Sequence, residues 1–187
     1  MRGARVLGAL VLGAVLGAGV LGAQAAKPAP GNPVVVIETV KGTIEIELYA
    51  KDAPKTVAHL LALFRQNFYR GQRFHRVEPG FLIQTGDPAT RDFTNRARWG
   101  TGGSGKSIGV AEIARARRHV RGAVGMAHRG SAAAADSQFY IMRGARPALD
   151  GKYAIVGRVL TGMDIVDSTA LNDMIRKVSV KGEGQQP

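Results

Sequence analysis

The stretch 74–87 reads FHRVEPGFLIQTGD and places a strongly basic side chain beside apolar and amide side chains. We expect one strand to carry Arg76, a Pro-Gly turn to follow, and a second strand to carry Phe81, Leu82 and Gln84. The guanidinium of Arg76 is permanently charged and presents several N–H donors in a rigid fork, so it suits stabilisation of a lone pair. Taken alone, Arg76 is better interpreted as an ordinary outward-facing strand residue, so its neighbours decide the assignment.

Further segments follow or precede this stretch in a fixed order: APKTV at 53–57, GTGG at 100–103, GMA at 125–127, SQFY at 137–140 and LDGKYAIVG at 149–157. Together with the first stretch they closely resemble the cyclophilin family, over nearly the whole of residues 34–180. The resemblance implies a peptidyl-prolyl cis–trans isomerase with an eight-stranded antiparallel barrel and two capping helices. It also implies proline-containing polypeptides as partners.

An X-Pro amide resists rotation because conjugation gives its C–N bond double-bond character, with a barrier of about 18–20 kcal/mol. In the twisted transition state the lone pair localises on the prolyl nitrogen. A donor aimed at that nitrogen stabilises the twisted state more than either planar state, and the resemblance assigns this role to Arg76. The mechanism requires no nucleophile, cofactor or metal.

The resemblance also implies a proline pocket. It assigns the catalytic positions to Arg76 and Gln84 and the substrate-binding positions to Phe81, Leu82, Ala127, His128, Gln138, Tyr140, Leu149 and Tyr153. Gln84 would hold a substrate carbonyl and orient Arg76, and Gln138 with the backbone near His128 would fix the residues before proline. Each apolar member, taken alone, is more simply a core residue.

The chain departs from the family pattern at several positions. Ala148 stands where many members carry Trp, which removes one wall of the pocket and the contact that cyclosporin-type inhibitors use. His128-Arg129 replaces Asn-Ala, the run 132–135 is all alanine, and His59 replaces an Asn. These departures are expected to affect substrate preference and the strength of peptide binding more than activity itself. His75 is expected to be structural, and no second His lies at ligand spacing, so we expect no metal site.

The elements that must position these residues are mostly strands. Residues 34–40 and 43–48 read as a hairpin in which Ile44, Ile46 and Leu48 alternate with Glu45 and Glu47. Further strands are expected at 73–77, 81–84, 123–127, 138–142, 153–160 and 175–180. The fold class is therefore mainly β, with a closed eight-stranded antiparallel β-barrel capped by two α-helices.

The first helix is expected to begin at Asp52-Ala53-Pro54, with Asp52 as its N-cap. Apolar residues then recur at helical spacing, at Val57, Leu60, Leu61 and Phe64, and the helix should end near Asn67. A second short helix fits 164–171.

The N-terminal residues read as a targeting segment. Arg2 and Arg5 precede an uncharged apolar run, and Ala23-Gln24-Ala25 has the small residues of a cleavage site before Ala26. We therefore expect a signal peptide at 1–25, a flexible linker at 26–33, the domain at 34–181 and a flexible tail at 182–187. The mature chain would be periplasmic or secreted, without stable membrane insertion; an uncleaved membrane anchor is the alternative.

The formal net charge of +12, which becomes +10 without Arg2 and Arg5, raises polyanions as partners. The basic residues are spread along the chain without aromatic interleaving, so we expect a solvated surface and no specific nucleic acid. We separately expect a monomer. The densest cluster, Arg115 to Arg121, suits at most weak binding to polyanions. The absence of cysteine excludes disulfides and thiolate chemistry.

Two other functions remain open. A cyclophilin-fold module could hold proline-containing segments with little turnover, although an intact Arg76 favours the enzyme. Residues 100–107, GTGGSGKS, also match the phosphate-loop pattern GxxxxGKS. Their flanks read as neither the buried strand nor the helix that a phosphate site needs. Nucleotide hydrolysis is therefore the less favoured alternative.

Overall fold

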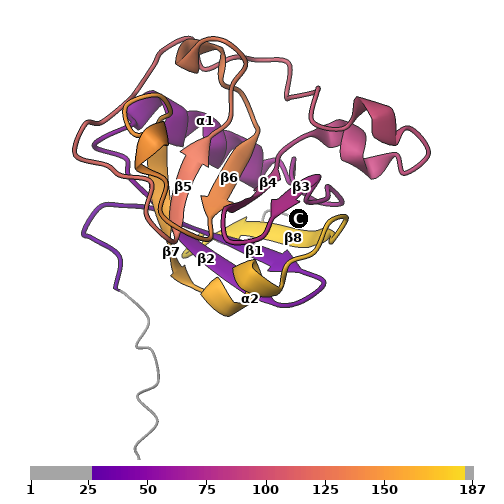
Figure 1. The fold of residues 1–187 in the computed structure, drawn as a ribbon. Helices are drawn as coiled ribbons and strands as arrows, with labels where there is room; N and C mark the ends of the chain where they lie inside the picture. Colours follow the sequence, from indigo (N-terminus) through magenta and orange to yellow (C-terminus); the bar gives the residue numbers. More distant parts are fainter. Residues whose placement is uncertain (1–26, 184–187) are drawn as a thin grey trace, which may run out of the picture.

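The structure, a computed structural model, describes residues 27–183 and contains there eight strands and two α-helices (Figure 1). The helices are α1 (Pro54–Arg65) and α2 (Met163–Ser168). The strands are β1 (Val34–Thr39), β2 (Thr43–Leu48), β3 (Arg76–Glu78), β4 (Leu82–Thr85), β5 (Ala123–Met126), β6 (Phe139–Met142), β7 (Ile155–Thr161) and β8 (Ile175–Val180). Every element begins and ends within three residues of its predicted bounds. The predicted signal peptide, its cleavage site and the last four residues of the predicted tail lie outside the described residues.

All eight strands form one antiparallel sheet in the order β3-β4-β6-β5-β7-β2-β1-β8. The mainly β class is confirmed, but the prediction of a closed barrel is wrong, because the sheet is an open half-barrel. The edge strands β3 and β8 form no ladder with each other. The segments directly before them are joined by an isolated bridge between Arg73 and Met174 and by irregular backbone hydrogen bonds, among them Phe74 N to Asp173 O at 3.0 Å. The segment that approaches β3 is a turn, with Asn172 at φ 75°, so it cannot continue the ladder of β8.

β2 shows both a confirmed pattern and an exception to it. Its aliphatic residues are buried as the alternation predicts: Ile44, Ile46 and Leu48. Glu47 was expected on the wet face, yet its side chain is only 1% exposed. Its carboxylate accepts hydrogen bonds from Ala29 N at 2.6 Å, Asn32 Nδ2 at 2.9 Å and Arg158 Nε at 2.7 Å, which offset the cost of burial. The described part of the predicted linker is thereby held against the domain.

The start of α1 differs from the prediction. The N-cap residue is Ala53, so the assignment of Asp52 as cap is wrong, and Asp52 instead pairs with Arg117 at 2.6 Å. The carboxylate of Glu112, distant in sequence, accepts from the main-chain N–H groups of residues 55 and 56 at 3.0 and 2.8 Å. The first turn of a helix needs such acceptors, and a negative charge there is favoured by the helix dipole.

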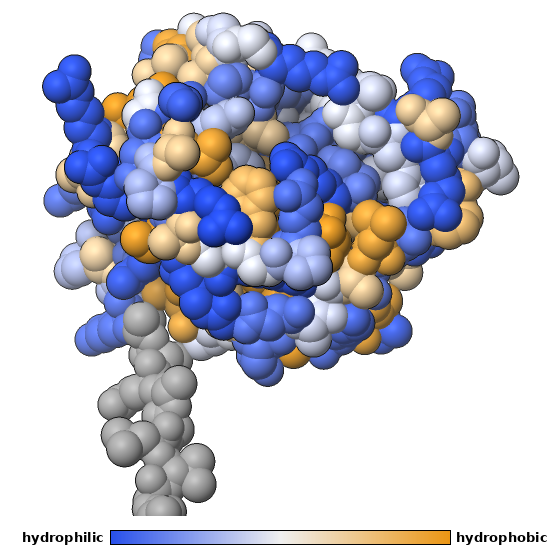
Figure 2. All heavy atoms as spheres, in the orientation of Figure 1, coloured by the Kyte–Doolittle hydropathy of each residue, from blue (hydrophilic) through white to orange (hydrophobic). Residues whose placement is uncertain are grey.

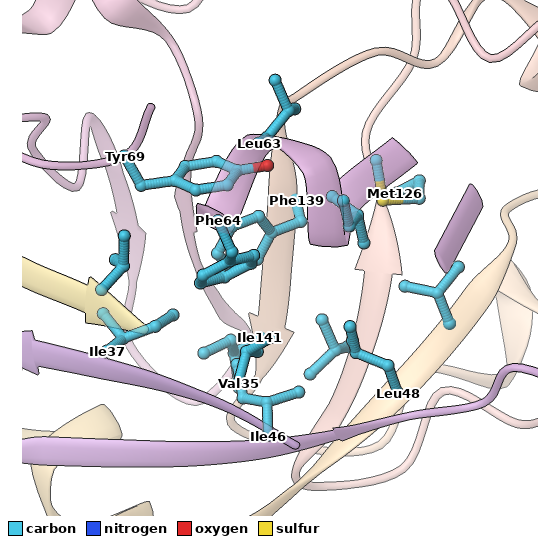
Figure 3. Close-up of a cluster of buried hydrophobic side chains, with 14 of the residues drawn as sticks. Val35, Ile37, Ile46, Leu48, Leu63, Phe64, Tyr69, Met126, Phe139 and Ile141 are labelled. Atoms are coloured by element: carbon cyan, nitrogen blue, oxygen red, sulfur yellow. The ribbon is translucent and has the colours of Figure 1, made fainter. Parts of the chain in front are cut away.

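The core lies between α1 and the sheet. Leu63 and Phe64 of α1, together with Tyr69, face strand residues such as Phe139 (Figure 3). A second, smaller cluster adjoins the main one and contains Tyr49, Leu82, Ala123, Tyr140, Met142 and Ile155, with Phe81, Ala127 and Tyr153 packed against it. This second cluster holds several predicted site residues in fixed positions. Within residues 27–183, no helix combines the length and the apolar content needed to cross a membrane.

Candidate active site

The ten predicted site residues line a single cavity of about 490 Å³. They come from β3, the turn after it, β4, the residues directly after β5, the residue before β6, β6 itself and the segment before β7. The remaining lining residues are Gly100, Thr101, Gly102, Gly103, Arg129, Ala134 and Asp136. The fold therefore gathers in one groove the residues that the sequence spreads between positions 76 and 153.

Arg76 stands at one edge of the groove, opposite Gln84 in the β3–β4 register. The turn between these strands needs a left-handed residue, and Gly80 supplies it at φ +64°. The guanidinium lies 5.6 Å from the ring centre of Phe81, and its Nε and Nη2 contact the Glu78 carboxylate at 2.7 and 2.6 Å. The Arg76 side chain is 47% exposed, so N–H groups remain available to a bound ligand.

A directional chain of hydrogen bonds links Arg76 to the far wall. Arg76 Nη1 donates to Gln84 Oε1 at 3.4 Å, Gln84 Nε2 donates to Gln138 Oε1 at 2.9 Å, and Gln138 Nε2 donates to Gly102 O at 2.7 Å. Each amide thus accepts on one side and donates on the other. The orientation of the guanidinium is coupled through two side chains to the loop at residues 100–103.

The floor of the cavity rests on a buried polar chain. The hydroxyl of Tyr140 lies 2.8 Å from Nε2 of His119, and Nδ1 of His119 lies 2.9 Å from Oδ1 of Asp150. Burial raises the pKa of Tyr140. Hydrogen bonds from the main chain and ring of His119 lower the pKa of Asp150. Gly125 provides the space, because a β-carbon there would overlap the Tyr140 ring.

The rim is aromatic on one side. The rings of His128 and Tyr153 lie 4.5 Å apart, and Tyr153 meets Tyr140 edge to face at 6.0 Å. Ala148 is exposed and is not among the residues that line the cavity.

The loop that matches the phosphate pattern forms one border of the groove. Several of its N–H and O–H groups already donate hydrogen bonds to carboxylate oxygens. Gly102 N donates to Asp87 Oδ2 at 3.1 Å, and Gly105 N donates to Asp136 Oδ2 at 3.0 Å. Ser104 Oγ also bonds to Asp136. No helix follows Ser107 before β5 in the described structure. The loop therefore binds carboxylates from other parts of the chain and lacks the geometry of a phosphate cradle.

His75 lies beneath this loop, against Gly100, where a β-carbon would come within 3.3 Å of the imidazole ring. Burial lowers the pKa of His75. Its place under the loop agrees with the structural role predicted for it. Among residues 27–183, no three His, Cys, Asp or Glu side chains converge in a way that could hold a metal ion.

Sequence reasoning did not assign His119, Arg129 or Asp136 to the site. His119 was considered only as part of a basic cluster, and it lies 21 positions from Tyr140 in the chain. Arg129 and Asp136 were not predicted as lining residues. None of the three carries a local motif, so only the fold identifies them.

Comparisons with known proteins agree with this geometry. The profile of the family described as cyclophilin type peptidyl-prolyl cis-trans isomerase/CLD matches residues 34–184. A probable peptidyl-prolyl cis-trans isomerase from Brucella suis is 42% identical over 147 residues, which cover 77% of this chain and 74% of the relative. A peptidyl-prolyl cis-trans isomerase from Helicobacter pylori is 35% identical over 144 residues, covering 76% and 83%.

Solved structures show the same fold. A cyclophilin type peptidyl-prolyl cis-trans isomerase from Cryptosporidium parvum superposes with a TM-score of 0.69 at 26% identity, over 82% of this chain and 99% of the other. A second crystal structure of that protein, in the presence of the dipeptide Ala-Pro, gives a TM-score of 0.66 at 27% identity, over 80% and 99%.

Proposed function

Because the chain belongs to the cyclophilin-type peptidyl-prolyl cis–trans isomerase family, we propose that its groove isomerises X-Pro bonds with Arg76 as the transition-state donor. The chain is an enzyme of this class, and proline-containing peptides are its substrates. The observation that carries the mechanism is the placement of a half-exposed guanidinium over the ring of Phe81, in the wall of a cavity that has both polar and apolar lining residues.

The proposed catalytic step is a rotation. The proline ring occupies the apolar part of the cavity, formed by Phe81, Leu82, Tyr140 and Leu149. The segment on the other side of the bond turns, and the nitrogen lone pair becomes localised as conjugation is lost. An N–H of Arg76 then donates to that nitrogen. The donor is worth more in the twisted state than in either planar state, which is the requirement for catalysis.

Gln84 has the role of positioning Arg76. Its Oε1 accepts from the guanidinium while its own amide is fixed by Gln138, so Arg76 is oriented before substrate arrives. Preorganised donors stabilise developing charge without a cost of reorganisation during the reaction. Ala127, His128 and Tyr153, which also line the cavity, would contact the residues around the proline.

A protease-coupled isomerisation assay with a short Ala-Pro peptide tests the proposed activity on the purified chain. The proposal predicts turnover well above the uncatalysed rate. Peptide binding without turnover would instead identify a holding module of the same fold. Absence of both would contradict the proposal.

We further propose that the substrates are exported proteins. The support is the sequence pattern of residues 1–25, with two arginines, an apolar run and a small-residue cleavage site. N-terminal sequencing of the protein from its host should find Ala26 as the first residue, outside the cytoplasm. An intact Met1 on membrane-bound protein would favour the anchor.

A further inference from the structure

A projecting part of the surface gathers arginines around two aromatic rings, one of them exposed. Residues 88–99, drawn in pink at the right of Figure 1, leave the sheet as two short 3-10 turns, Pro88–Arg91 and Arg96–Arg98. We call residues 91–99, with Arg70 and Arg73 beside them, the arginine lobe. Figure 2 shows hydrophilic and hydrophobic side chains mixed on this projection.

The aromatic centre of the lobe is Phe93, which is 49% exposed. Trp99 meets its ring edge to face at 5.6 Å. The guanidinium groups of Arg73 and Arg96 lie over the Phe93 ring at 5.2 and 4.9 Å from its centre. Arg73 precedes β3 in the chain, so folding creates the interleaving of cations and aromatic rings that the sequence did not show.

The charges of the lobe are not neutralised. Four of its arginines are exposed: Arg70, Arg91, Arg96 and Arg98. Among residues 27–183, none of these four, nor Arg73, has a carboxylate oxygen within 4.0 Å of its guanidinium nitrogens. The one exposed acid of the lobe, Asp92, accepts from Thr94 N and Oγ1 instead.

The basic cluster that stands out in the sequence is different. Three of its arginines pair with carboxylates of the domain: Arg117 with Asp52, Arg118 with Asp150 and Arg121 with Asp167. Most of its positive charge is therefore compensated locally. The arginine lobe has fewer positive charges per residue than the cluster Arg115 to Arg121. In the described part of the folded protein, however, more of the lobe's arginines are without a carboxylate partner.

We propose that the arginine lobe binds the surface of an anionic lipid bilayer. Arginine pairs well with phosphate groups, and aromatic rings beside basic residues suit the headgroup region of a membrane. Single-stranded nucleic acid is the competing polyanion, but base stacking needs a free ring face. The guanidiniums of Arg73 and Arg96 already lie against the Phe93 ring, which leaves less of it free to stack on a base and favours the lipid surface. The binding is adsorption and involves no insertion of a helix.

The test uses the chain beginning at Ala26, which contains every described element and both hydrophobic clusters. Co-sedimentation should find this protein on vesicles of phosphatidylglycerol with phosphatidylcholine and not on phosphatidylcholine alone. Binding should weaken as salt rises, because the screening length falls from about 10 Å at 0.1 M to about 3 Å at 1 M.

Substitutions locate the surface. Arg70→Gln with Arg98→Gln removes two charges whose side chains make no hydrogen bond within the described structure, so the fold should be unaffected. Each arginine near an anionic surface contributes about fivefold to partitioning, so the pair should lose about 25-fold. The matched control, Arg115→Gln with Arg176→Gln, removes the same charge from exposed positions elsewhere and should change binding much less. Phe93→Ala should also weaken binding.

The remaining outcomes would overturn the proposal. Equal binding to both kinds of vesicle, or equal losses in the lobe and control pairs, would show that the lobe is not the binding surface. Tighter binding to single-stranded oligonucleotide than to the anionic vesicles would assign the lobe to nucleic acid. Peptide isomerisation by the lobe pair should equal that of the unmodified chain, which separates this test from that of the enzyme activity.

Discussion

The hydroxyl of Tyr140 lies 2.8 Å from Nε2 of His119, a side chain that is fully buried behind the floor of the proline pocket. An ionised carboxylate only accepts hydrogen bonds, so Asp150 fixes Nδ1 of His119 as the donor. In the neutral ring Nε2 then accepts from Tyr140. The pocket floor is thus held by a polar chain as well as by packing.

His119→Leu should destabilise the protein and weaken peptide binding, because it leaves the buried hydroxyl of Tyr140 without its acceptor. The expected cost is about 1–3 kcal/mol in the free energy of unfolding. Tyr140→Phe alone should cost less, because it keeps the aromatic ring. In the double variant the losses should be non-additive by about 1 kcal/mol or more. Urea denaturation of the four proteins measures this coupling, and strict additivity would show that the two groups do not interact.

Stability should fall in acid partly because of Glu47. Burial raises the pKa of this carboxyl, but hydrogen bonds from Asn32, Ala29 and Arg158 outweigh it, and the net pKa lies below the ordinary value of 4.5. A lowered pKa in the folded state contributes stability above pH 4.5 that is lost as pH falls further. Melting temperature against pH should therefore be flatter below that value in Glu47→Gln, which should also be less stable at neutral pH. A parallel pair of curves would contradict this assignment.

Nucleotide triphosphates should not bind at residues 100–107. The N–H groups of Gly102 and Gly105 already donate to Asp87 and Asp136, so few donors remain for a phosphate. Isothermal titration with ATP and magnesium should give no heat beyond dilution. Micromolar binding that Lys106→Ala abolishes would overturn this interpretation.

Cyclosporin-type cyclic peptides should inhibit the enzyme weakly. The resemblance implies that sensitive members of the family carry Trp at the position of Ala148; its ring would supply a large apolar contact and an N–H donor, and Ala148 supplies neither. Ala148→Trp should tighten inhibition with little change in turnover of small peptides. Inhibition constants of the two proteins provide the measurement. Tight inhibition of the unmodified chain would show that other contacts compensate.

The strands could be predicted well because they depend on local patterns, and the members of the groove could be predicted through the resemblance to a known family. Alternation identified β2, and the stretch 74–87 identified the arms that carry Arg76 and Gln84. Closure of the barrel could not be predicted, since it depends on how the turn at Asn172 meets the chain before β3.

Long-range polar contacts were also beyond the sequence. Glu112 caps α1 from 56 positions away, and Glu47 is buried only because the preceding segment folds back over it. His119 lies in the segment before β5 and contacts the hydroxyl of Tyr140 in β6. Such pairs leave no periodicity in the chain, since each depends on the position of a loop.

The most direct test of the proposed mechanism is the effect of Arg76→Ala on isomerisation of an Ala-Pro peptide. The variant should lose about 100-fold or more in kcat/KM, as expected for removal of one preorganised donor. Its melting temperature should stay close to that of the unmodified chain, because the side chain is half-exposed and its ion pair with Glu78 lies at the surface. Near-normal kcat/KM in a folded Arg76→Ala variant would contradict the assignment of Arg76 as the donor to the prolyl nitrogen.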